Sequence, residues 1–197
     1  MTRDARAQSH QLDRRKVVAE ILRDIGNTLV VTSLGTPTKD AAAAGDRDLT
    51  IALRGAMGSS VPLALGLARA QPNRRVLVIA GDGEMLMAIG SLATVGAMQP
   101  ANLAIAVLDN ERYGETGGQP THTAQGTDLA IFARGAGIKR SSTVRDGPGL
   151  AAAVRALLHE PGPVFVAIKV STEDLPLKMP PVAGTALRTR FRHVLGT

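Results

Sequence analysis

The sequence predicts an α/β fold of three layers, in which a mostly parallel sheet lies between two layers of helices. Short apolar runs alternate along the whole chain with segments in which apolar residues recur at helical spacing. The runs at 76–80 and 103–108 contain no polar residue, which is typical of strands buried on both faces of a parallel sheet. The segments between successive runs are long enough for the helical crossovers that parallel strands require.

Each expected element follows from its own pattern. Apolar residues at helical spacing predict a first helix over 12–25, and a β-branched run predicts a strand over 28–33. A glycine-rich loop is expected over 110–126. The other expected strands lie at 51–53, 76–80, 103–108, near Ile138 and at 164–170, and the other helices run from Thr36 through the alanines and over 59–70, 85–98, 128–134 and 150–159.

The 197 residues fit one compact domain. We expect a basic N-terminal arm over residues 1–11, the domain itself over 12–170 and an extended C-terminal tail over 171–197. The tail is expected to be extended because prolines interrupt it, and a proline removes a backbone donor and blocks a continuing helix. These prolines are Pro176, Pro180 and Pro181.

Composition excludes several classes of function. The chain has no cysteine, so disulfides, iron–sulfur clusters, thiolate zinc sites and cysteine nucleophiles are ruled out. The net charge is +6 with much of the excess at the two ends, but aromatic residues make up only 2%. We therefore expect solvated basic termini and no nucleic acid as a partner, which keeps a nucleic-acid binder as a remote alternative. No apolar run reaches transmembrane length and no secretory signal begins the chain, which predicts a cytoplasmic protein that makes no membrane contact.

A Gly81-Asp82-Gly83 turn follows the most clearly predicted strand and precedes a helix. Glycines at that place let backbone N–H groups approach a phosphate closely, and the helix N-terminus adds a favourable dipole. Because Asp82 would repel the phosphate, a divalent cation is implied between them, and magnesium prefers oxygen ligands of this kind. Taken alone, the same tripeptide is more often an ordinary turn.

A second oxygen ligand is expected from Asn110, at the end of the next strand. One βαβ unit fits between Gly83 and Asn110, and such a unit places the two strand ends side by side. A backbone carbonyl near Arg112 would supply a third oxygen. The sequence therefore predicts a magnesium–diphosphate site at the carboxyl edge of the sheet. Neither the dinucleotide-binding fingerprint nor the P-loop motif occurs, which disfavours those two alternatives.

Gly81-Asp82-Gly83, followed at this distance by Asn110, resembles the signature of thiamine-diphosphate enzymes. The resemblance implies a thiamine-diphosphate-binding fold with thiamine diphosphate and Mg²⁺ as cofactors. The metal ligands that it implies are Asp82, Asn110 and the Arg112 backbone carbonyl. The cofactor-binding residues that it implies are Gly55, Met57, Gly58, Gly81, Asp82, Gly83, Glu84, Asn110, Arg112, Tyr113 and Gly114. In the family a bulky apolar residue at the place of Met57 bends the cofactor, whereas without the resemblance this residue would read as an ordinary core methionine.

Four further segments are similar to two groups within the family, the beta subunits of sulfopyruvate decarboxylases and the C-terminal domains of phosphonopyruvate decarboxylases. They are 34–39, Asp46-Arg47, 90–94 and 113–123. The likeness covers about 12–170 and departs from the pattern at Glu84 and Glu115. It implies decarboxylation of 3-sulfopyruvate to sulfoacetaldehyde and CO2. A phosphonopyruvate decarboxylase, another lyase or carboligase on the same cofactor, and a non-catalytic cofactor-binding module remain alternatives.

The resemblance also implies a missing half of the enzyme. In the family the cofactor lies between two domains, and this chain contains only the one that binds the diphosphate. The expected partner is a pyrimidine-binding alpha subunit that carries the main catalytic Glu, in an α2β2 or larger assembly. The expected substrate is a small anionic 2-oxoacid.

The loop over 114–123 is the expected substrate wall, since its glycines allow movement and its polar side chains can donate hydrogen bonds. The catalytic candidates there are His122, whose ordinary pKa suits proton transfer, Gln119 and Glu115. Each is also a common type of exposed loop residue. Glu84 begins a helix, so we expect it to interact with the helix dipole and to point away from the diphosphate.

Overall fold

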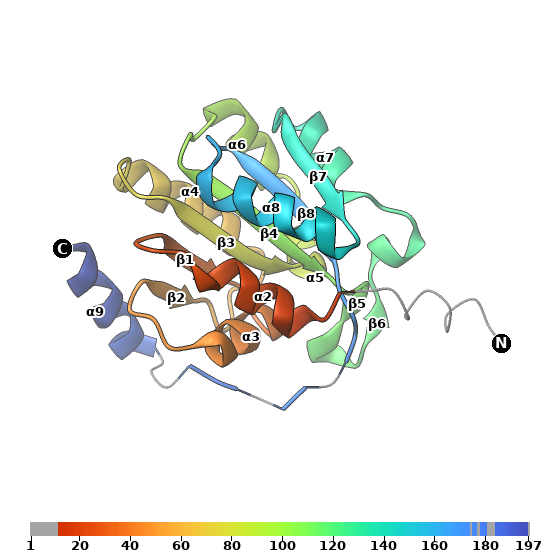
Figure 1. Cartoon of the computed structure of the whole chain (residues 1–197), viewed down its shortest axis with the longest axis horizontal. Coiled ribbons are helices and arrows are strands. Elements are labelled where there is room, and N and C mark those ends of the chain that lie inside the picture. Colours follow the sequence, from red (N-terminus) through yellow and green to blue (C-terminus); the bar gives the residue numbers. More distant parts are fainter. Residues whose placement is uncertain (1–11, 174, 177, 181–183, 197) are drawn as a thin grey trace.

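The computed structural model contains a six-stranded sheet with helices on both faces (Figure 1). It describes residues 12–173, 175–176, 178–180 and 184–196, so the expected basic arm over 1–11 lies outside the described residues. The strand order is β2-β1-β3-β4-β8-β7, and every neighbouring pair is parallel. The strands are β1 (Leu29–Thr32), β2 (Thr50–Ala52), β3 (Val76–Gly81), β4 (Leu103–Asp109), β7 (Arg140–Val144) and β8 (Val164–Lys169). The expected three-layer fold with a parallel sheet is confirmed.

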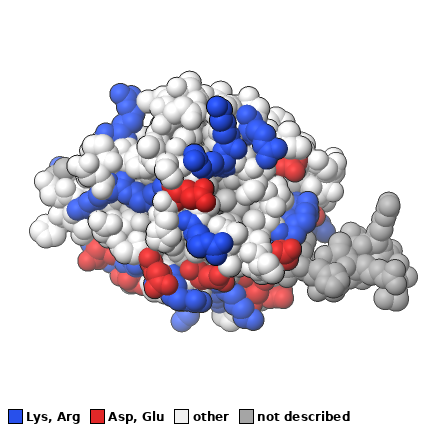
Figure 2. Space-filling model, turned by 45° about the horizontal axis from the view of Figure 1, so that its top comes forward, with Lys and Arg blue, Asp and Glu red and all other residues white. Residues whose placement is uncertain are grey.

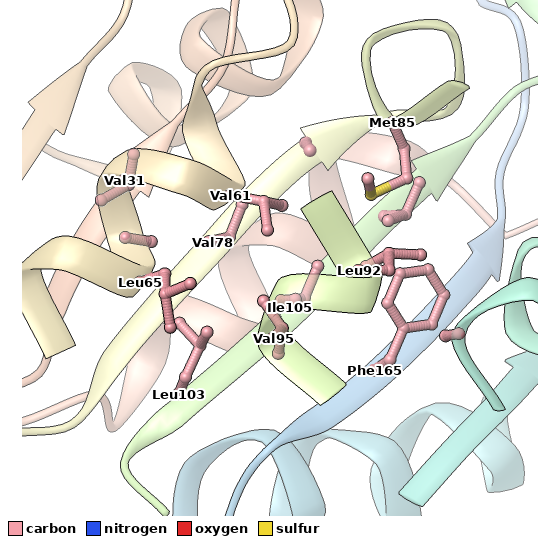
Figure 3. Packing of buried hydrophobic residues seen from close by; sticks show 14 of the residues in the cluster. Val31, Val61, Leu65, Val78, Met85, Leu92, Val95, Leu103, Ile105 and Phe165 are labelled. Atoms are coloured by element: carbon pink, nitrogen blue, oxygen red, sulfur yellow. The ribbon is translucent and has the colours of Figure 1, made fainter. Parts of the chain in front are cut away.

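Two hydrophobic cores, one on each face of the sheet, hold the layers together. The first face is covered by α2 (Arg14–Arg23), α3 (Thr36–Ala44) and α8 (Gly147–His159). The second is covered by α4 (Ser60–Ala70), α6 (Ser91–Met98) and α7 (Leu129–Gly135). Figure 3 shows the second core, where Val78, Ile105 and Phe165 of three neighbouring strands lie under side chains of α4 and α6. Because apolar side chains leave both faces of β3, β4 and β8, these strands are buried throughout, as the sequence predicts.

The region after β3 differs from the single helix expected over 85–98. The structure has two helices, α5 (Asp82–Met87) and α6, and the first begins at Asp82 itself. The chain leaves α5 at Ala88, whose N–H bonds to the carbonyls of Glu84 and Met85, and re-enters a helix after Gly90. Apolar spacing continues across this break, so periodicity alone does not reveal it.

The expected extended tail over 171–197 is wrong for its last part. The described residues between β8 and α9 (Gly184–Leu195) run along one edge of the molecule, and α9 packs beside β2 (Figure 1). Leu187 and Phe191 of α9 are buried, and Arg190 forms a bidentate ion pair with the Asp46 carboxylate, with N–O distances of 2.6 and 2.9 Å. This pairing holds the pKa of Asp46 below its usual value. The prolines lie before the helix and do not prevent it.

The expected glycine-rich loop over 110–126 is an ordered hairpin. It consists of β5 (Arg112–Tyr113), η2 (Gly114–Thr116), β6 (Gln119–Pro120) and η3 (His122–Gln125). Gly117 and Gly118 have φ of 114° and 75°, a region that favours glycine and lets the chain reverse between the two short strands. The hairpin lies against the carboxyl ends of the central strands, at the place where an α/β sheet binds its ligands.

Charged side chains do not form a continuous stripe on the face shown in Figure 2. Lys and Arg are separated there by uncharged areas, and they alternate with Asp and Glu along the lower edge. Over the part of the chain that the structure describes, no helix is long and apolar enough to span a membrane.

Candidate functional site

A cavity of about 100 Å³ lies at the carboxyl ends of β1, β3 and β4. Its walls come from the start of α3, the start of α5 and the hairpin that follows β4, with Met57 added from the segment before α4. The residues that line it are Leu34, Gly35, Thr36, Pro37, Met57, Gly81, Asp82, Gly83, Glu84, Leu108, Asn110, Arg112, Tyr113, Gly114, Glu115 and Thr116. The fold therefore brings Asp82 and Asn110 to one cavity.

Asp82 is buried and held by two hydroxyl groups. Thr121 Oγ1 donates to Oδ2 at 2.6 Å, and Thr123 Oγ1 lies 3.2 Å from the same oxygen, with one proton to share between Asp82 and Asp109. Oδ1 is the carboxylate oxygen that these hydroxyls do not use. Burial, and then the nearby charge of Asp109, raise the pKa of Asp82 to about 6. A bound cation would favour the charged form of this carboxylate and lower its pKa again.

The sequence reasoning missed a second buried carboxylate beside Asp82. Asp109 accepts a hydrogen bond from Thr123 Oγ1 at 2.8 Å and pairs with Lys169 Nζ at 2.8 Å. Lys169 also contacts Glu111 Oε1 at 2.6 Å. Burial opposes the charge of Lys169, but its bonds to the two carboxylates outweigh that effect and raise its pKa. We call Asp82, Thr121, Thr123, Asp109 and Lys169 the carboxylate network.

Asn110 stands in a tight turn that prepares it and Arg112 as oxygen donors. The Arg112 N–H donates to Asn110 Oδ1 at 3.1 Å, which fixes the amide and leaves that oxygen a second lone pair. Between them Glu111 adopts φ of 62°, a left-handed conformation that is rare for a residue other than glycine. Arg112 lies opposite Pro120, which has no N–H to donate to the Arg112 carbonyl.

Two glycines admit neighbouring groups at the cavity wall. The Tyr113 ring packs so closely on Gly83 that a Cβ there would lie 2.5 Å from a ring atom. Gly35, with φ of 82°, precedes α3, and no side chain caps this helix. The first turn of α3 therefore presents uncapped backbone N–H groups beside the cavity, an arrangement that suits an anion.

Glu84 does not act as the sequence led us to expect. It lines the cavity, and its Oε1 accepts bonds from the N–H and the hydroxyl of Ser60, at 3.2 and 2.5 Å. Glu84 thus caps the N-terminus of α4, in addition to lying near the N-terminus of its own helix. Burial raises its pKa, and its other oxygen, Oε2, is a buried atom without a hydrogen-bond partner.

The residues expected at the cofactor rings are only partly at the cavity. Met57 lines it with 36% of its surface exposed. Gly55 and Gly58 flank Met57 but do not contribute to the cavity wall as the structure describes it. Gly58 has φ of 86°, so the turn that presents Met57 favours glycine there.

The three catalytic candidates of the hairpin lie in different places. Glu115 lines the cavity and pairs with Lys39 Nζ at 2.6 Å. Gln119 is exposed, and its amide exchanges two hydrogen bonds with Thr116, both of 2.8 Å. His122 is exposed at the start of η3. The structure therefore brings Glu115, and neither Gln119 nor His122, to the cavity wall, and the catalytic roles of all three stay predictions.

The donor set fits magnesium and a diphosphate. Asp82 and Asp109 are neighbouring buried carboxylates, and the cation Lys169 pairs with Asp109 and Glu111, so a positive charge beside Asp82 would be favourable. Carboxylate, amide and carbonyl oxygens are ligands that magnesium accepts, and the uncapped turn of α3 suits phosphate. Within the described residues, no group of three or more His, Cys, Asp or Glu side chains forms a metal site of another kind.

The fold and this site define a class of protein. Residues 35–168 match the family described as thiamine pyrophosphate enzyme, C-terminal TPP binding domain. The match covers more than half of the chain and contains the cavity wall almost entirely. The chain belongs to this family.

Several curated relatives of the chain are decarboxylases. The chain is 37% identical over 131 residues to the sulfopyruvate decarboxylase subunit beta of Methanocaldococcus jannaschii, which covers 66% of this chain and 69% of the relative. It is 31% identical over 185 residues to the subunit beta of Methanococcus maripaludis, covering 94% of this chain and 98% of the relative. It is also 36% identical to the phosphonopyruvate decarboxylase of Streptomyces viridochromogenes, covering 92% of this chain but only 45% of that relative.

Solved structures share the fold at lower sequence identity. A putative thiamin diphosphate-dependent enzyme from Mycobacterium smegmatis superposes with a TM-score of 0.69 at 23% identity, covering 82% of this chain and 32% of that one. Benzoylformate decarboxylase from Polynucleobacter necessarius gives a TM-score of 0.68 at 21% identity, covering 83% and 33%. This chain therefore corresponds in fold to about one third of each of these larger chains.

Proposed function

We propose that this chain is the diphosphate- and Mg²⁺-binding subunit of a two-subunit decarboxylase that converts 3-sulfopyruvate to sulfoacetaldehyde and CO2. The observation that carries the proposal is Asp82, a buried carboxylate held by two threonines at a cavity that it shares with Asn110 and the uncapped start of α3. Near full-length similarity to a sulfopyruvate decarboxylase subunit beta supports the choice of substrate.

The chain's own residues would bind and orient the reacting groups. Asp82, Asn110 and the Arg112 carbonyl hold Mg²⁺, and the N–H groups at the start of α3 contact the diphosphate. Met57 supplies an apolar surface against the cofactor rings. When bound, thiamine diphosphate supplies the electron sink that accepts the electron pair left behind as CO2 departs.

A partner subunit completes the proposed site. A cavity of about 100 Å³ can take the diphosphate end of the cofactor. A site that encloses a whole small-molecule ligand usually has a volume of about 300–1,000 Å³. Met57 is partly exposed where the rings would lie. We propose a pyrimidine-binding alpha subunit that covers this side, excludes water and contributes the main catalytic Glu, in an α2β2 or larger assembly. Location in the cytoplasm stays a prediction.

Phosphonopyruvate is the alternative substrate, because similarity to a phosphonopyruvate decarboxylase extends over 92% of this chain. Sulfonate and phosphonate are both tetrahedral oxyanions, so the cavity does not separate them by shape. That relative is about twice as long as this chain, whereas the M. maripaludis relative matches over nearly its whole length, which favours the separate-subunit enzyme.

The test is co-expression of this chain with its partner subunit, followed by assay against a panel of 2-oxoacids with thiamine diphosphate and Mg²⁺. We expect CO2 and a free aldehyde from 3-sulfopyruvate. A new carbon–carbon bond in the product would indicate a carboligase instead. Asp82→Ala is expected to abolish both Mg²⁺-dependent cofactor binding and activity, because it removes a charged metal ligand. Asp48→Ala, at an exposed carboxylate, serves as the matched control, and an active Asp82→Ala enzyme would overturn the site assignment.

A further inference from the structure

The Lys39–Glu115 ion pair lies where three cavities meet. Glu115 lines the cofactor cavity, a larger hollow of about 470 Å³ and a smaller one of about 180 Å³. Lys39 lines the two hollows but not the cofactor cavity. The Glu115 carboxylate therefore separates Lys39 from the place where the cofactor is proposed to bind.

Positive charge predominates around this pair. Five cationic and two acidic side chains line the two hollows. They are Arg14, Arg15, Lys39, Arg54 and Arg112, with Glu115 and Glu173. Arg14 and Arg15 are already paired with the buried Asp40. Arg54 lines the smaller hollow and makes no ion pair or hydrogen bond within the part of the chain that the structure describes.

The ion pair itself is accessible enough to open. Nζ of Lys39 and Oε1 of Glu115 are 2.6 Å apart, but 44% of the Glu115 side chain and 21% of the Lys39 side chain are exposed. Exposed pairs of this kind contribute little, so a second anion can compete with Glu115 for Lys39. The carboxylate of Glu115 thus marks a position at which the chain holds anionic oxygens.

We propose that Lys39, together with Arg54, binds the sulfonate or phosphonate group of the substrate, and that Glu115 occupies Lys39 until the substrate displaces it. This inference rests on the proposed function and names the residues that select an anionic 2-oxoacid. An ammonium and a guanidinium on one hollow suit a tetrahedral oxyanion, because both donate charge-assisted hydrogen bonds to it. Lys39 is here a specificity-determining residue, since its contact is with the substituent and not with the bond that breaks.

The test measures binding without turnover. The complex of this chain with its partner subunit, thiamine diphosphate and Mg²⁺ is titrated by calorimetry with sulfoacetate and with propionate, which has a methyl group in place of the sulfonate. We expect Lys39→Met to weaken sulfoacetate binding at least about tenfold and to change propionate binding less than about twofold, because one charge-assisted contact is lost. Arg54→Met should weaken sulfoacetate binding several-fold in the same selective way.

Glu115→Gln gives the more specific result. Because the competing carboxylate is gone, sulfoacetate binding should become about threefold tighter, and the KM for 3-sulfopyruvate should fall while kcat changes less. Lys139→Met is the matched control, because this exposed lysine directly precedes β7 and lines neither hollow. It should leave the binding of both sulfoacetate and propionate unchanged.

Three results would overturn the inference: equal effects of Lys39→Met on both probes, weaker sulfoacetate binding in Glu115→Gln, or a loss of cofactor affinity in Lys39→Met in place of sulfoacetate affinity. The last result would assign Lys39 to the diphosphate. Failure of the proposed function looks different, because the complex would then bind sulfoacetate selectively through Lys39 but release CO2 from no 2-oxoacid.

Discussion

The two sides of the site are built in opposite ways. The carboxylate network is buried, and its members are joined by contacts of 2.6 to 3.2 Å between the start of α5, the ends of β4 and β8, and the hairpin. The Lys39–Glu115 pair is partly exposed and rests on one short contact. The comparison indicates that the carboxylate network, which would hold the metal, is fixed before any ligand binds. At the Lys39–Glu115 pair, where the substrate is proposed to bind, one anion can replace another.

The largest effect is expected from Lys169→Met, which leaves Asp109 and Glu111 without their shared cation. Removing one partner of a buried ion pair costs about 3 kcal/mol, so the free energy of unfolding should fall by about that amount. Urea unfolding of the purified chain measures this. Asp109→Asn combined with Lys169→Met should recover part of the lost stability. An unchanged urea midpoint in Lys169→Met alone would show that the carboxylate network does not hold this part of the site rigid.

Asp82→Asn should stabilise the chain in the absence of metal and cofactor. The folded-state pKa of Asp82 is about 6, above the ordinary 3.8, so between these values the folded chain holds a proton that the unfolded chain has released. Stability from this group is therefore present at low pH and is lost as the pH rises from about 4 to about 6. At pH 7 the variant should be more stable by on the order of 2 kcal/mol.

Thermal unfolding across pH 4 to 8 checks that prediction. The wild-type chain should lose stability over this range and the variant should lose less of it. Addition of Mg²⁺ with thiamine diphosphate should reverse the ranking, because only the wild-type carboxylate can bind the cation well. A variant that is less stable than the wild type at pH 7 without ligands would contradict the burial argument.

Thr121→Val tests how far the network orients Asp82. Valine keeps the shape of threonine but removes the hydroxyl that donates to Asp82 Oδ2 at 2.6 Å, so the shorter of the two hydroxyl contacts of that oxygen is lost. We expect a loss of about 1 kcal/mol in stability and about tenfold weaker Mg²⁺ binding, measured by cofactor titration at varied Mg²⁺. Thr189→Val, at an exposed hydroxyl of α9 that bonds to Thr185 within its own helix, is the control. Equal Mg²⁺ affinity in both variants would deny Thr121 a positioning role.

The smallest effect on stability is expected from Glu115→Gln. An ion pair with this exposure contributes less than about 1 kcal/mol, so the unfolding midpoint should hardly move. The same denaturation assay as for Lys169→Met makes the two regions directly comparable. A loss as large as that of Lys169→Met would mean that the exposed pair is structural, and the contrast between the two sides would fail.

The sequence predicted the parts of the site that depend on neighbouring strands in chain order. Asp82 and Asn110 directly follow β3 and β4, which are consecutive in the chain and paired in the sheet, and one βαβ unit brings such ends together. Lys169 ends β8, which pairs with β4 although the hairpin, α7, β7 and α8 lie between them in the sequence. Its contact with Asp109 therefore depends on tertiary strand order, which local patterns do not contain.

Two further features were out of reach for a similar reason. Thr121 and Thr123 look like ordinary polar loop residues, and only the folding of the hairpin onto β3 turns their hydroxyls inward toward Asp82. Helix α9 has a weak local signal, but its pairing with Asp46 and its buried Phe191 hold it against β2. Long-range contacts decided both outcomes.

The bond between Glu84 and Ser60 joins the turn after β3 to the start of α4, and Met57 lies just ahead of that helix. A carboxylate buried at position 84 needs a donor opposite it, whereas a small residue there would not. The residues at these two positions should therefore covary among related sequences. Relatives with an acidic residue at 84 should carry a hydroxyl residue at 60, and relatives with a small residue at 84 should vary freely at 60.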